Sequence, residues 1–164
     1  MRVVFLVIVI FLFPFMHGFC ADSENAVFED ANFRAARQAM EEQNYTESVK
    51  LLSEVNLRYP QHPTVLDHLA YSYLKLGMSE DAIVTYRNAF RAAAKSSIVS
   101  PKGLGKMWSN LGLAYTQQEK QGEALAAFQK AAELNPDDAK TWQRLGQAHA
   151  KLGQEEQAHK AYER

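Results

Sequence analysis

The sequence predicts an all-α protein built from a repeated pair of antiparallel helices. Three observations predict this fold class. An apolar skeleton recurs every 34 residues, a spacing typical of helix-turn-helix arrays. Within a unit, apolar residues such as Leu111 and Tyr115 lie four apart, and residues at this spacing share one helix face. Gly, Asn and Pro fall between the apolar segments, where helices should end. One helix pair cannot bury its apolar face alone, so we expect the pairs to stack.

The clearest unit occupies residues 105–138. Its skeleton is Trp108, Leu111, Gly112, Tyr115, Ala124, Phe128, Ala131 and Pro136. The gaps match the repeat pattern W-x2-L-G-x2-Y, then A-x3-F, then P. On these residues the chain resembles the tetratricopeptide repeat (TPR) family. The resemblance implies a right-handed superhelix of antiparallel helix pairs whose concave surface holds other proteins or peptides.

Shifting the 34-residue frame along the chain identifies three further units. We expect about four repeats, the first degenerate and the last incomplete. The resulting organisation is a lead-in at 21–28, a TPR-like unit at 29–62, a TPR at 63–96, an insertion loop at 97–104, a TPR at 105–138 and a truncated TPR at 139–164. The insertion is read as a loop because it contains Pro101 and Gly103.

The spacing predicts helices at residues 25–42, 45–58, 63–76, 79–95, 104–118, 121–134, 139–152 and 155–164. Gly77 and Gly153 should end first helices, because Gly accepts the left-handed conformation of a helix end. Thr46 and Ser79 are placed to begin second helices. Small residues such as Gly112 should let the helices of a unit approach closely, and the large aromatic residues should fill the core beside that contact.

The first 20 residues are predicted to be a secretory signal peptide. Arg2 precedes an apolar run from Val3 to Met16, which is too short for a typical membrane-spanning helix. Cleavage is expected after Cys20, with Ala21 nearly as good. Two alternatives stay open: an uncleaved N-terminal anchor, and lipidation of Cys20, which the bulky Phe19 disfavours. Each alternative exports the repeats, so we expect a periplasmic or secreted protein whose only membrane contact is this segment, if it is uncleaved.

Composition excludes several function classes. The formal net charge of −1 lacks the basic excess of a nucleic-acid binder. The single cysteine, Cys20, cannot form an internal disulfide, and the sequence has no Cys/His cluster for a metal. We find no nucleophile elbow, phosphate loop or zinc-protease motif, so we expect no cofactor and no enzymatic activity. His149 replaces a core aromatic residue and should be packed rather than catalytic.

The resemblance implies that the first helix of each unit lines a peptide-binding groove. Carrying the groove positions over gives Phe33, Arg37, Tyr71, Lys106, Asn110, Leu113, Lys140 and Arg144. The basic residues among them favour an anionic ligand segment in the C-terminal half, and the aromatic ones favour apolar contact in the N-terminal half. Some family members clamp a carboxylate with five residues. Asn110, Lys140 and Arg144 fit that clamp, whereas Asp67 would repel a carboxylate. The same charges also fit a solvated face.

These observations predict an exported adaptor or scaffold that binds an extended peptide or partner helix in the groove. The alternative is a structural unit that dimerises through its uncapped final helix. Asn44-Tyr45-Thr46 is an N-glycosylation sequon in a predicted turn, so Asn44 should be exposed. It would be modified only in a eukaryotic host. The sequence does not identify the partner.

Overall fold

The computed structural model describes residues 25–164 of the chain, and the predicted signal peptide lies outside the described residues. A short helical stretch at residues 25–29 precedes the longer helices. These are α2 (Ala31–Glu41), α3 (Tyr45–Arg58), α4 (Pro63–Lys75), α5 (Ser79–Ala93), α6 (Pro101–Gln117), α7 (Gln121–Leu134), α8 (Ala139–Lys151) and α9 (Glu155–Tyr162). Between residues 25 and 164 no helix is both long enough and apolar enough to cross a bilayer.

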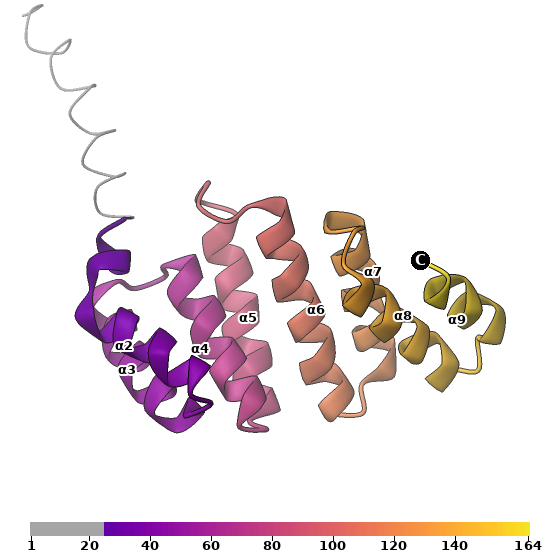
Figure 1. Cartoon of the computed structure of the whole chain (residues 1–164), viewed down its shortest axis with the longest axis horizontal. Coiled ribbons are helices and arrows are strands. Elements are labelled where there is room, and N and C mark those ends of the chain that lie inside the picture. The colour runs from indigo at the N-terminus through magenta and orange to yellow at the C-terminus, as the bar shows by residue number, and fades with distance from the viewer. Residues whose placement is uncertain (1–24) are drawn as a thin grey trace, which may run out of the picture.

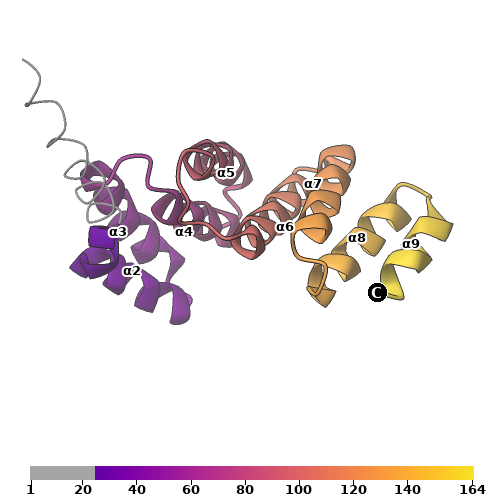
Figure 2. The ribbon, with the colours of Figure 1, turned by 90° about the horizontal axis from the view of Figure 1, so that it is seen from above.

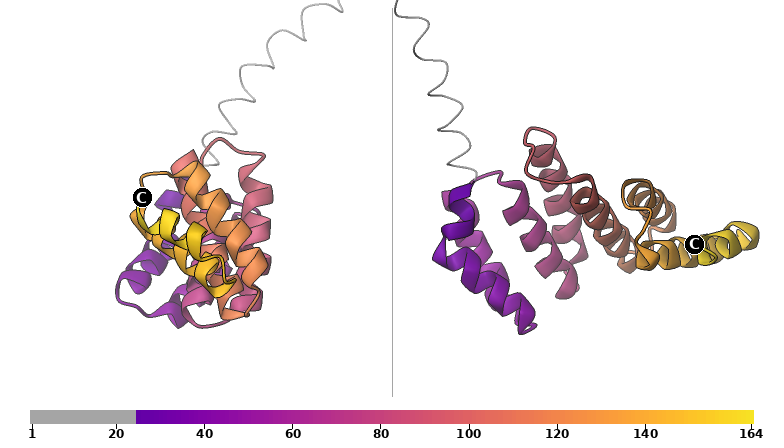
Figure 3. Two further views of the ribbon diagram at one scale, coloured as in Figure 1. Left: turned by 90° about the vertical axis from the view of Figure 1, so that its right-hand side faces the viewer. Right: turned by 45° about the horizontal axis from the view of Figure 1, so that its top comes forward.

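The helices pack as consecutive antiparallel pairs, and the pairs stack along one axis. The closest packing joins α2 to α3, α4 to α5, α6 to α7 and α8 to α9. Each pair then contacts the next through α3 and α4, α5 and α6, and α7 and α8. Figures 1 and 3 show the resulting row, with α2 at one end and α9 at the other. The observed architecture is the predicted all-α solenoid of helix pairs.

One expected helix and one expected cap were wrong at the N-terminus. The helix predicted at 25–42 is interrupted at Asp30, whose backbone is extended (φ −62°, ψ 125°). The Asp30 carboxylate accepts hydrogen bonds from the backbone N–H groups of Asn32 and Phe33, so it caps α2. Helix α3 spans the predicted residues 45–58, but its cap is Asn44 rather than Thr46, because Asn44 Oδ1 accepts a hydrogen bond from the Glu47 N–H at 3.2 Å.

The insertion loop predicted at 97–104 is only partly a loop. Helix α5 ends at Ala93 and α6 begins at Pro101, so the second half of that segment is the first turn of α6. Ser100 caps this turn by accepting a hydrogen bond from the Gly103 N–H at 3.1 Å. Proline has no N–H and a fixed φ, and both properties suit the first position of a helix. Pro101 therefore starts a helix here instead of marking a loop.

The predicted helix ends and the close helix contacts are confirmed. Gly77 and Gly153 have φ values of 75° and 72° immediately after α4 and α8. A Cβ atom added to Gly112 would lie 2.5 Å from the Phe128 ring, so only glycine lets α6 and α7 approach this closely. In the last unit Gly146 faces the Tyr162 ring in the same way. His149 is buried, as expected, and its Nδ1 atom lies 2.6 Å from Gln154 Oε1.

Buried apolar residues form two adjoining clusters. The N-terminal cluster is Val27, Phe33, Ala36, Leu52, Val55, Val65 and Leu69. The larger cluster runs through the remaining units to Ala161, and Tyr73 packs against both. Between the second and third units, the rings of Phe90 and Trp108 stack with centroids 4.3 Å apart. Burial of one such side chain contributes about 1.5–3 kcal/mol, so this contact helps hold successive units together.

Candidate functional site

One side of the row is formed by the first helix of each pair. Seen from above, α5 and α7 lie on one side of the row, and α4, α6 and α8 lie on the other (Figure 2). Helix α4 contacts both α2 and α6 directly, although each belongs to a different pair. We call the face formed by α2, α4, α6 and α8 the wall. The eight predicted groove residues all lie on these four helices.

The wall contains a hollow of about 500 Å³ between α6 and the start of α8. We call it the basic hollow. Its lining residues are Lys106, Ser109, Asn110, Asp138, Ala139, Lys140 and Arg144. Four residues predicted from the sequence therefore meet here, although they come from two units. Three lining side chains are cationic and one is anionic at neutral pH, so the hollow carries a net positive charge.

Hydrogen bonds fix the geometry of the basic hollow. The Arg144 guanidinium donates through Nη1 to Ser109 Oγ at 2.7 Å. The Thr141 hydroxyl lies 3.0 Å from Ser109 Oγ and 2.6 Å from Asp138 Oδ2. Ser109 and Thr141 are both fully buried, with 1% of each exposed. This network ties α6 to α8 and holds the Arg144 side chain against the wall at the hollow.

The start of α8 adds to the positive character of the basic hollow. Asp138 occupies the N-cap position, but its side chain does not cap the helix. Its carboxylate accepts a hydrogen bond from the Thr141 hydroxyl instead. The first N–H groups of a helix have no intrahelical acceptor and carry the positive end of the helix dipole. Ala139 and Lys140, the first two residues of α8, line the hollow, so this helix end adds to its positive potential.

A different polar cluster lies on the N-terminal side of the basic hollow, where α4 meets α6. It contains Asp67 and Tyr71 on α4, Tyr86 on α5, and Lys106 and Asn110 on α6, and we call it the Asp67 cluster. Burial raises the pKa of Asp67 to about 7, although the positive charge of Lys106 acts in the opposite direction. Burial, followed by the negative charge of Asp67, raises the pKa of Tyr86 well above its usual value.

The Asp67 cluster contains unsatisfied polar groups. The Tyr86 side chain is 0% exposed, and its hydroxyl has no hydrogen-bond partner of good geometry among the described residues. The nearby Asn110 side chain lowers the pKa of Tyr86, but it does not complete such a bond. Within residues 25–164 no ion pair reaches Asp67. Unlike the basic hollow, this cluster is not closed by its own hydrogen bonds.

The N-terminal part of the wall differs from the prediction. Phe33 was expected to contact ligand, but it is 1% exposed. The ring centroids of Phe28 and His68 lie 5.8 Å and 5.3 Å from the centroid of the Phe33 ring. The two rings cover Phe33, which therefore belongs to the core. Arg37 is exposed on α2. It lines a separate hollow with Arg34, Gln38, Glu41 and Glu42. The carboxylates of Glu41 and Glu42 offset the positive charges of the two arginines there.

The remaining predicted residues are accessible to different degrees. Tyr71 and Leu113 are partly buried, and Tyr71 packs edge-on against Tyr45 with ring centroids 6.2 Å apart. Asn44 is exposed, as expected for a sequon residue. Sequence reasoning missed two polar groups, one at the basic hollow and one buried beneath the Asp67 cluster. Asp138 could have been found from its place directly before a predicted helix. The Tyr86 hydroxyl could not, because the repeat pattern assigns that ring to the core.

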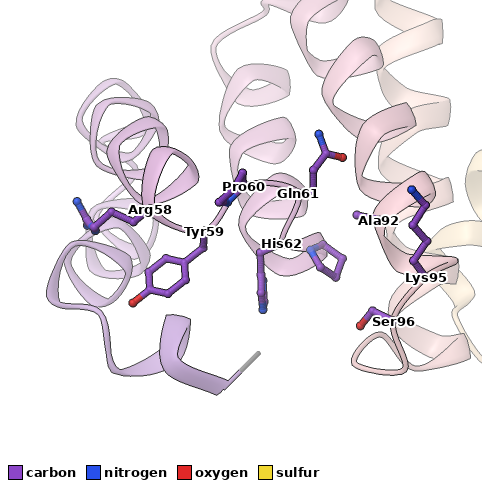
Figure 4. A pocket seen from close by; sticks show the side chains of 9 residues that line it. Arg58, Tyr59, Pro60, Gln61, His62, Ala92, Lys95 and Ser96 are labelled. Carbon is purple, nitrogen blue, oxygen red and sulfur yellow. The ribbon is translucent and has the colours of Figure 1, made fainter. Parts of the chain in front are cut away.

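A second sizeable hollow, of about 490 Å³, lies where α3 ends and α4 begins. Its lining includes Arg58, His62 and Lys95, and Figure 4 shows Arg58 and Lys95 on opposite sides of His62. The Arg58 guanidinium donates two hydrogen bonds of 2.9 Å to the Asp30 carboxylate. Its charge is thus already paired. In the basic hollow, by contrast, Lys106, Lys140 and Arg144 form no ion pair with another described residue, so their charges remain available to an anion.

The final helix presents a mostly charged outer surface. Lys160 pairs with Glu156 at 2.6 Å, and His159 lies 3.3 Å from Glu163. Tyr162 is 50% exposed and is the large apolar side chain that α9 offers to solvent. This surface does not favour dimerisation through α9 over ligand binding on the wall. Among the described residues, no three His, Cys, Asp or Glu side chains gather closely enough to hold a metal ion.

Comparison with known proteins agrees with this architecture. Residues 63–96 match the family described as tetratricopeptide repeat, and residues 112–153 match the family described as TPR repeat. A search of curated protein sequences gives no significant match.

Solved structures with a similar fold are numerous. The MamA RS-1 ArsTM double mutant superposes with a TM-score of 0.70 at 20% identity, over 93% of this chain and 89% of that one. The Sgt2 TPR domain from Aspergillus fumigatus gives a TM-score of 0.62 at 23% identity, over 73% of this chain and 76% of that one. In the Cut9–Hcn1 hetero-tetramer the TM-score is 0.71 at 20% identity, over 77% of this chain but 24% of that one. The repeat matches, the helix pairing and these fold relatives together identify the chain as a tetratricopeptide repeat protein.

Proposed function

We propose that this protein is an adaptor that holds an acidic segment of a partner protein in the basic hollow. TPR repeats support a protein partner in general, and one fold relative, Cut9, forms a hetero-tetramer with Hcn1. The observation that carries the proposal is the convergence of Lys106, Lys140 and Arg144 on one hollow of about 500 Å³. An acidic side chain or a C-terminal carboxylate is the chemistry that these cations and the α8 N-terminus recognise.

Arg144 is the residue best suited to anchor the acidic group. Its hydrogen bond to the buried Ser109 already restricts the side chain, so less conformational entropy is lost when ligand binds. Its guanidinium keeps further donors for a carboxylate. Lys106 and Lys140 are exposed and supply charge from either side. Ligand binding should therefore depend on residues of both α6 and α8, and on the relative position of the two helices.

We propose that the adaptor works outside the cytosol. Support for this comes from the signal-like pattern of residues 1–20, which lie outside the described residues. Fractionation of cells that produce the full chain tests this part separately. Recovery of the protein with its N-terminus intact in the cytosol would contradict it.

The binding proposal can be tested by selecting peptides from a random 12-residue display library against three proteins. These are the wild type, Lys140→Glu with Arg144→Glu, and the control Lys120→Glu with Lys130→Glu. The control makes the same charge change with two exposed lysines, the α7 N-cap residue and a residue within α7. We expect acidic residues to be enriched with the wild type and the control, and lost with the Lys140/Arg144 variant.

Fluorescence anisotropy with the best selected peptide gives the magnitude. Loss of two charge-assisted contacts, each about 1.5 kcal/mol, should weaken binding by the wall variant by about a hundredfold. The α7 control should bind within about threefold of the wild type. Equal loss in both variants would show that binding depends on net charge only, and unchanged binding by the wall variant would place the ligand elsewhere.

A further inference from the structure

The longest stretch of the chain without an acidic residue is 82–118. It contains five basic residues and no Asp or Glu, although the whole chain has a formal net charge of −1. The stretch covers most of α5, the loop that follows it and α6. One of the five cations, Lys106, lines the basic hollow. We call the other four the basic band, and they are Arg87, Arg91, Lys95 and Lys102.

The basic band faces solvent on the outer side of α5. Arg87, Arg91 and Lys95 follow one another at intervals of four residues, so they share one face of α5 and of the turn that ends it. The buried residues of α5, such as Ile83 and Tyr86, point in a different direction, into the core. All four side chains of the basic band are exposed. The band is therefore separate from the wall that holds the basic hollow.

The charges of the basic band are not neutralised by the protein. Arg87 donates through Nη2 to the Tyr115 hydroxyl at 3.0 Å, and Arg91 donates through Nη1 to Asn88 Oδ1 at 2.9 Å. Both acceptors are uncharged, so these bonds orient the guanidinium groups and leave their charge intact. Within residues 25–164 no ion pair includes a member of the basic band. Four positive charges thus remain available to an anionic partner.

The loop between α5 and α6 places two apolar side chains among these cations. Ile98 and Val99 lie between Lys95 and Lys102 in the chain, and both are half-buried. Val99 packs against the larger core cluster, and the Ile98 N–H donates to Ser96 Oγ at 3.1 Å, so the loop has a defined shape. Apolar side chains flanked by cations suit the boundary between the headgroups and the acyl chains of a bilayer.

The same edge of the row carries the start of the described chain. Figures 1 and 3 show the loop between α5 and α6 at this edge, together with the first described residues. The contacts agree, because the Phe28 ring lies 6.0 Å from the His62 ring, and His62 and Lys95 line one hollow. Residues 17–24 connect this edge to the apolar run that ends at Met16, and eight residues span at most about 29 Å. An N-terminal segment held in a bilayer would keep this edge close to the lipid surface.

We propose that the basic band and the Ile98 side chain form a docking surface for an anionic lipid bilayer. A bilayer is favoured over an acidic protein because the cations spread along a helix face and a loop, with apolar side chains between them, instead of converging on one hollow. This surface is a membrane contact in addition to the N-terminal segment, and it does not depend on the ligand of the basic hollow. Binding should fall steeply as salt rises, since exposed charges are screened over about 8 Å at physiological ionic strength.

Vesicle sedimentation tests the proposal. The protein is the chain from Ala21 onwards, which contains every described helix and lacks the apolar run. The vesicles consist of phosphatidylcholine alone, or of phosphatidylcholine with about one third phosphatidylglycerol, which is anionic. We expect the protein to sediment with the anionic vesicles and to stay in solution with the neutral ones. Absence of binding to the anionic vesicles at low salt would overturn the proposal.

A matched pair of variants tests the basic band itself. Arg91→Glu with Lys95→Glu should weaken vesicle binding by about 25-fold, because each cation near an anionic surface contributes about a fivefold factor. The control Lys120→Glu with Lys151→Glu makes the same charge change at two exposed lysines outside the band. It should bind within about threefold of the wild type. An equal loss in both variants would show that only net charge matters, which contradicts a defined docking surface.

The variant Ile98→Trp tests the contribution of the loop. On anionic vesicles with brominated acyl chains, the new indole should be quenched and its emission should shift to shorter wavelength. The wild type, whose emission comes from Trp108 and Trp142, should change little and serves as the control. Binding without quenching at position 98 would show that the loop does not reach the acyl chains, and would overturn its part in the surface.

Two further measurements separate this inference from its alternatives. Binding to soluble polyglutamate that depends on Arg91 and Lys95, with vesicles left unbound, would assign the basic band to an acidic protein and overturn the bilayer. An acidic peptide selected for the basic hollow should bind the Arg91/Lys95 variant as tightly as the wild type. That result shows that the variant is folded, so the adaptor proposal and the bilayer proposal can fail independently.

Discussion

The two junctions on either side of α6 have opposite chemistry. Between α6 and α8, the cations Lys140 and Arg144 meet a closed network of hydrogen bonds through Ser109 and Thr141. Between α4 and α6, Asp67 lies partly buried without an ion pair in the described chain. The repeat places equivalent helices in equivalent positions. The residues that the repeat leaves free then give each junction its own charge.

The largest expected effect concerns the α4–α6 junction. The pKa of Asp67 is raised to about 7 in the folded state, so the protonated carboxyl is the form that folding favours. Asp67 therefore stabilises the fold at pH below its unfolded pKa, and this stability is lost as the pH rises towards 7. At about 1.4 kcal/mol per pKa unit, the loss is on the order of 2–4 kcal/mol between pH 4 and 8. Urea unfolding of the wild type and Asp67→Asn at several pH values measures it as the difference between the two curves.

The difference between those curves isolates Asp67 from His68, whose lowered pKa acts in the opposite direction. The depressed pKa of His68 stabilises the fold above its unfolded pKa, and this stability is lost as the pH falls. Asp137→Asn, in an exposed turn, serves as the control and should follow the wild type. Parallel curves for Asp67→Asn and the wild type would contradict the buried state of Asp67.

Helix α6 belongs to both junctions, so its packing against α7 supports both. Gly112→Ala should lower the free energy of unfolding by about 2 kcal/mol, because the new methyl group meets the Phe128 ring, which is 2% exposed and has no room to move. Gly146→Ala meets Tyr162 in the same geometry, but that ring is 50% exposed and can shift outward. We expect this variant to lose about half as much. Urea unfolding compares the two, and equal losses would show that ring exposure does not govern the cost.

The smallest expected effect concerns the α6–α8 junction. Thr141→Val keeps the buried shape and removes the hydroxyl that lies between Ser109 and Asp138, which should cost about 1 kcal/mol in unfolding free energy. Thr116→Val is the matched control, because the Thr116 hydroxyl donates to the Gly112 carbonyl of its own helix and does not join α6 to α8. It should change stability by less than about 0.5 kcal/mol. If the two variants have equal effects, the hydrogen-bond network does not hold the junction.

The sequence predicted the repeat architecture well, because apolar spacing and small residues directly determine how helix pairs stack. Gly112 against Phe128 and the left-handed Gly77 and Gly153 follow from local rules. The prediction failed where a residue has two local roles. Pro101 was read as part of a loop but begins a helix, and Phe33 was placed in the groove although a preceding helical turn covers it.

The chemistry of the wall was less predictable than its position. Lys106, Asn110, Lys140 and Arg144 were found from their repeat positions, and they do line one hollow. The state of Asp67 was not found, because it depends on how deeply three helices bury its carboxylate. The chain Arg144–Ser109–Thr141–Asp138 joins residues up to 35 positions apart, and no local pattern encodes it.

The most direct test of the central claim is to map a selected acidic peptide by backbone-amide NMR on the labelled protein. The proposal predicts that the largest chemical-shift changes fall on α6 around residues 106–110 and on the start of α8 at residues 138–144. They should disappear in the Lys140→Glu/Arg144→Glu variant and remain in the Lys120→Glu/Lys130→Glu control. Changes confined to α5 and α7, or to the hollow at the end of α3, would contradict it.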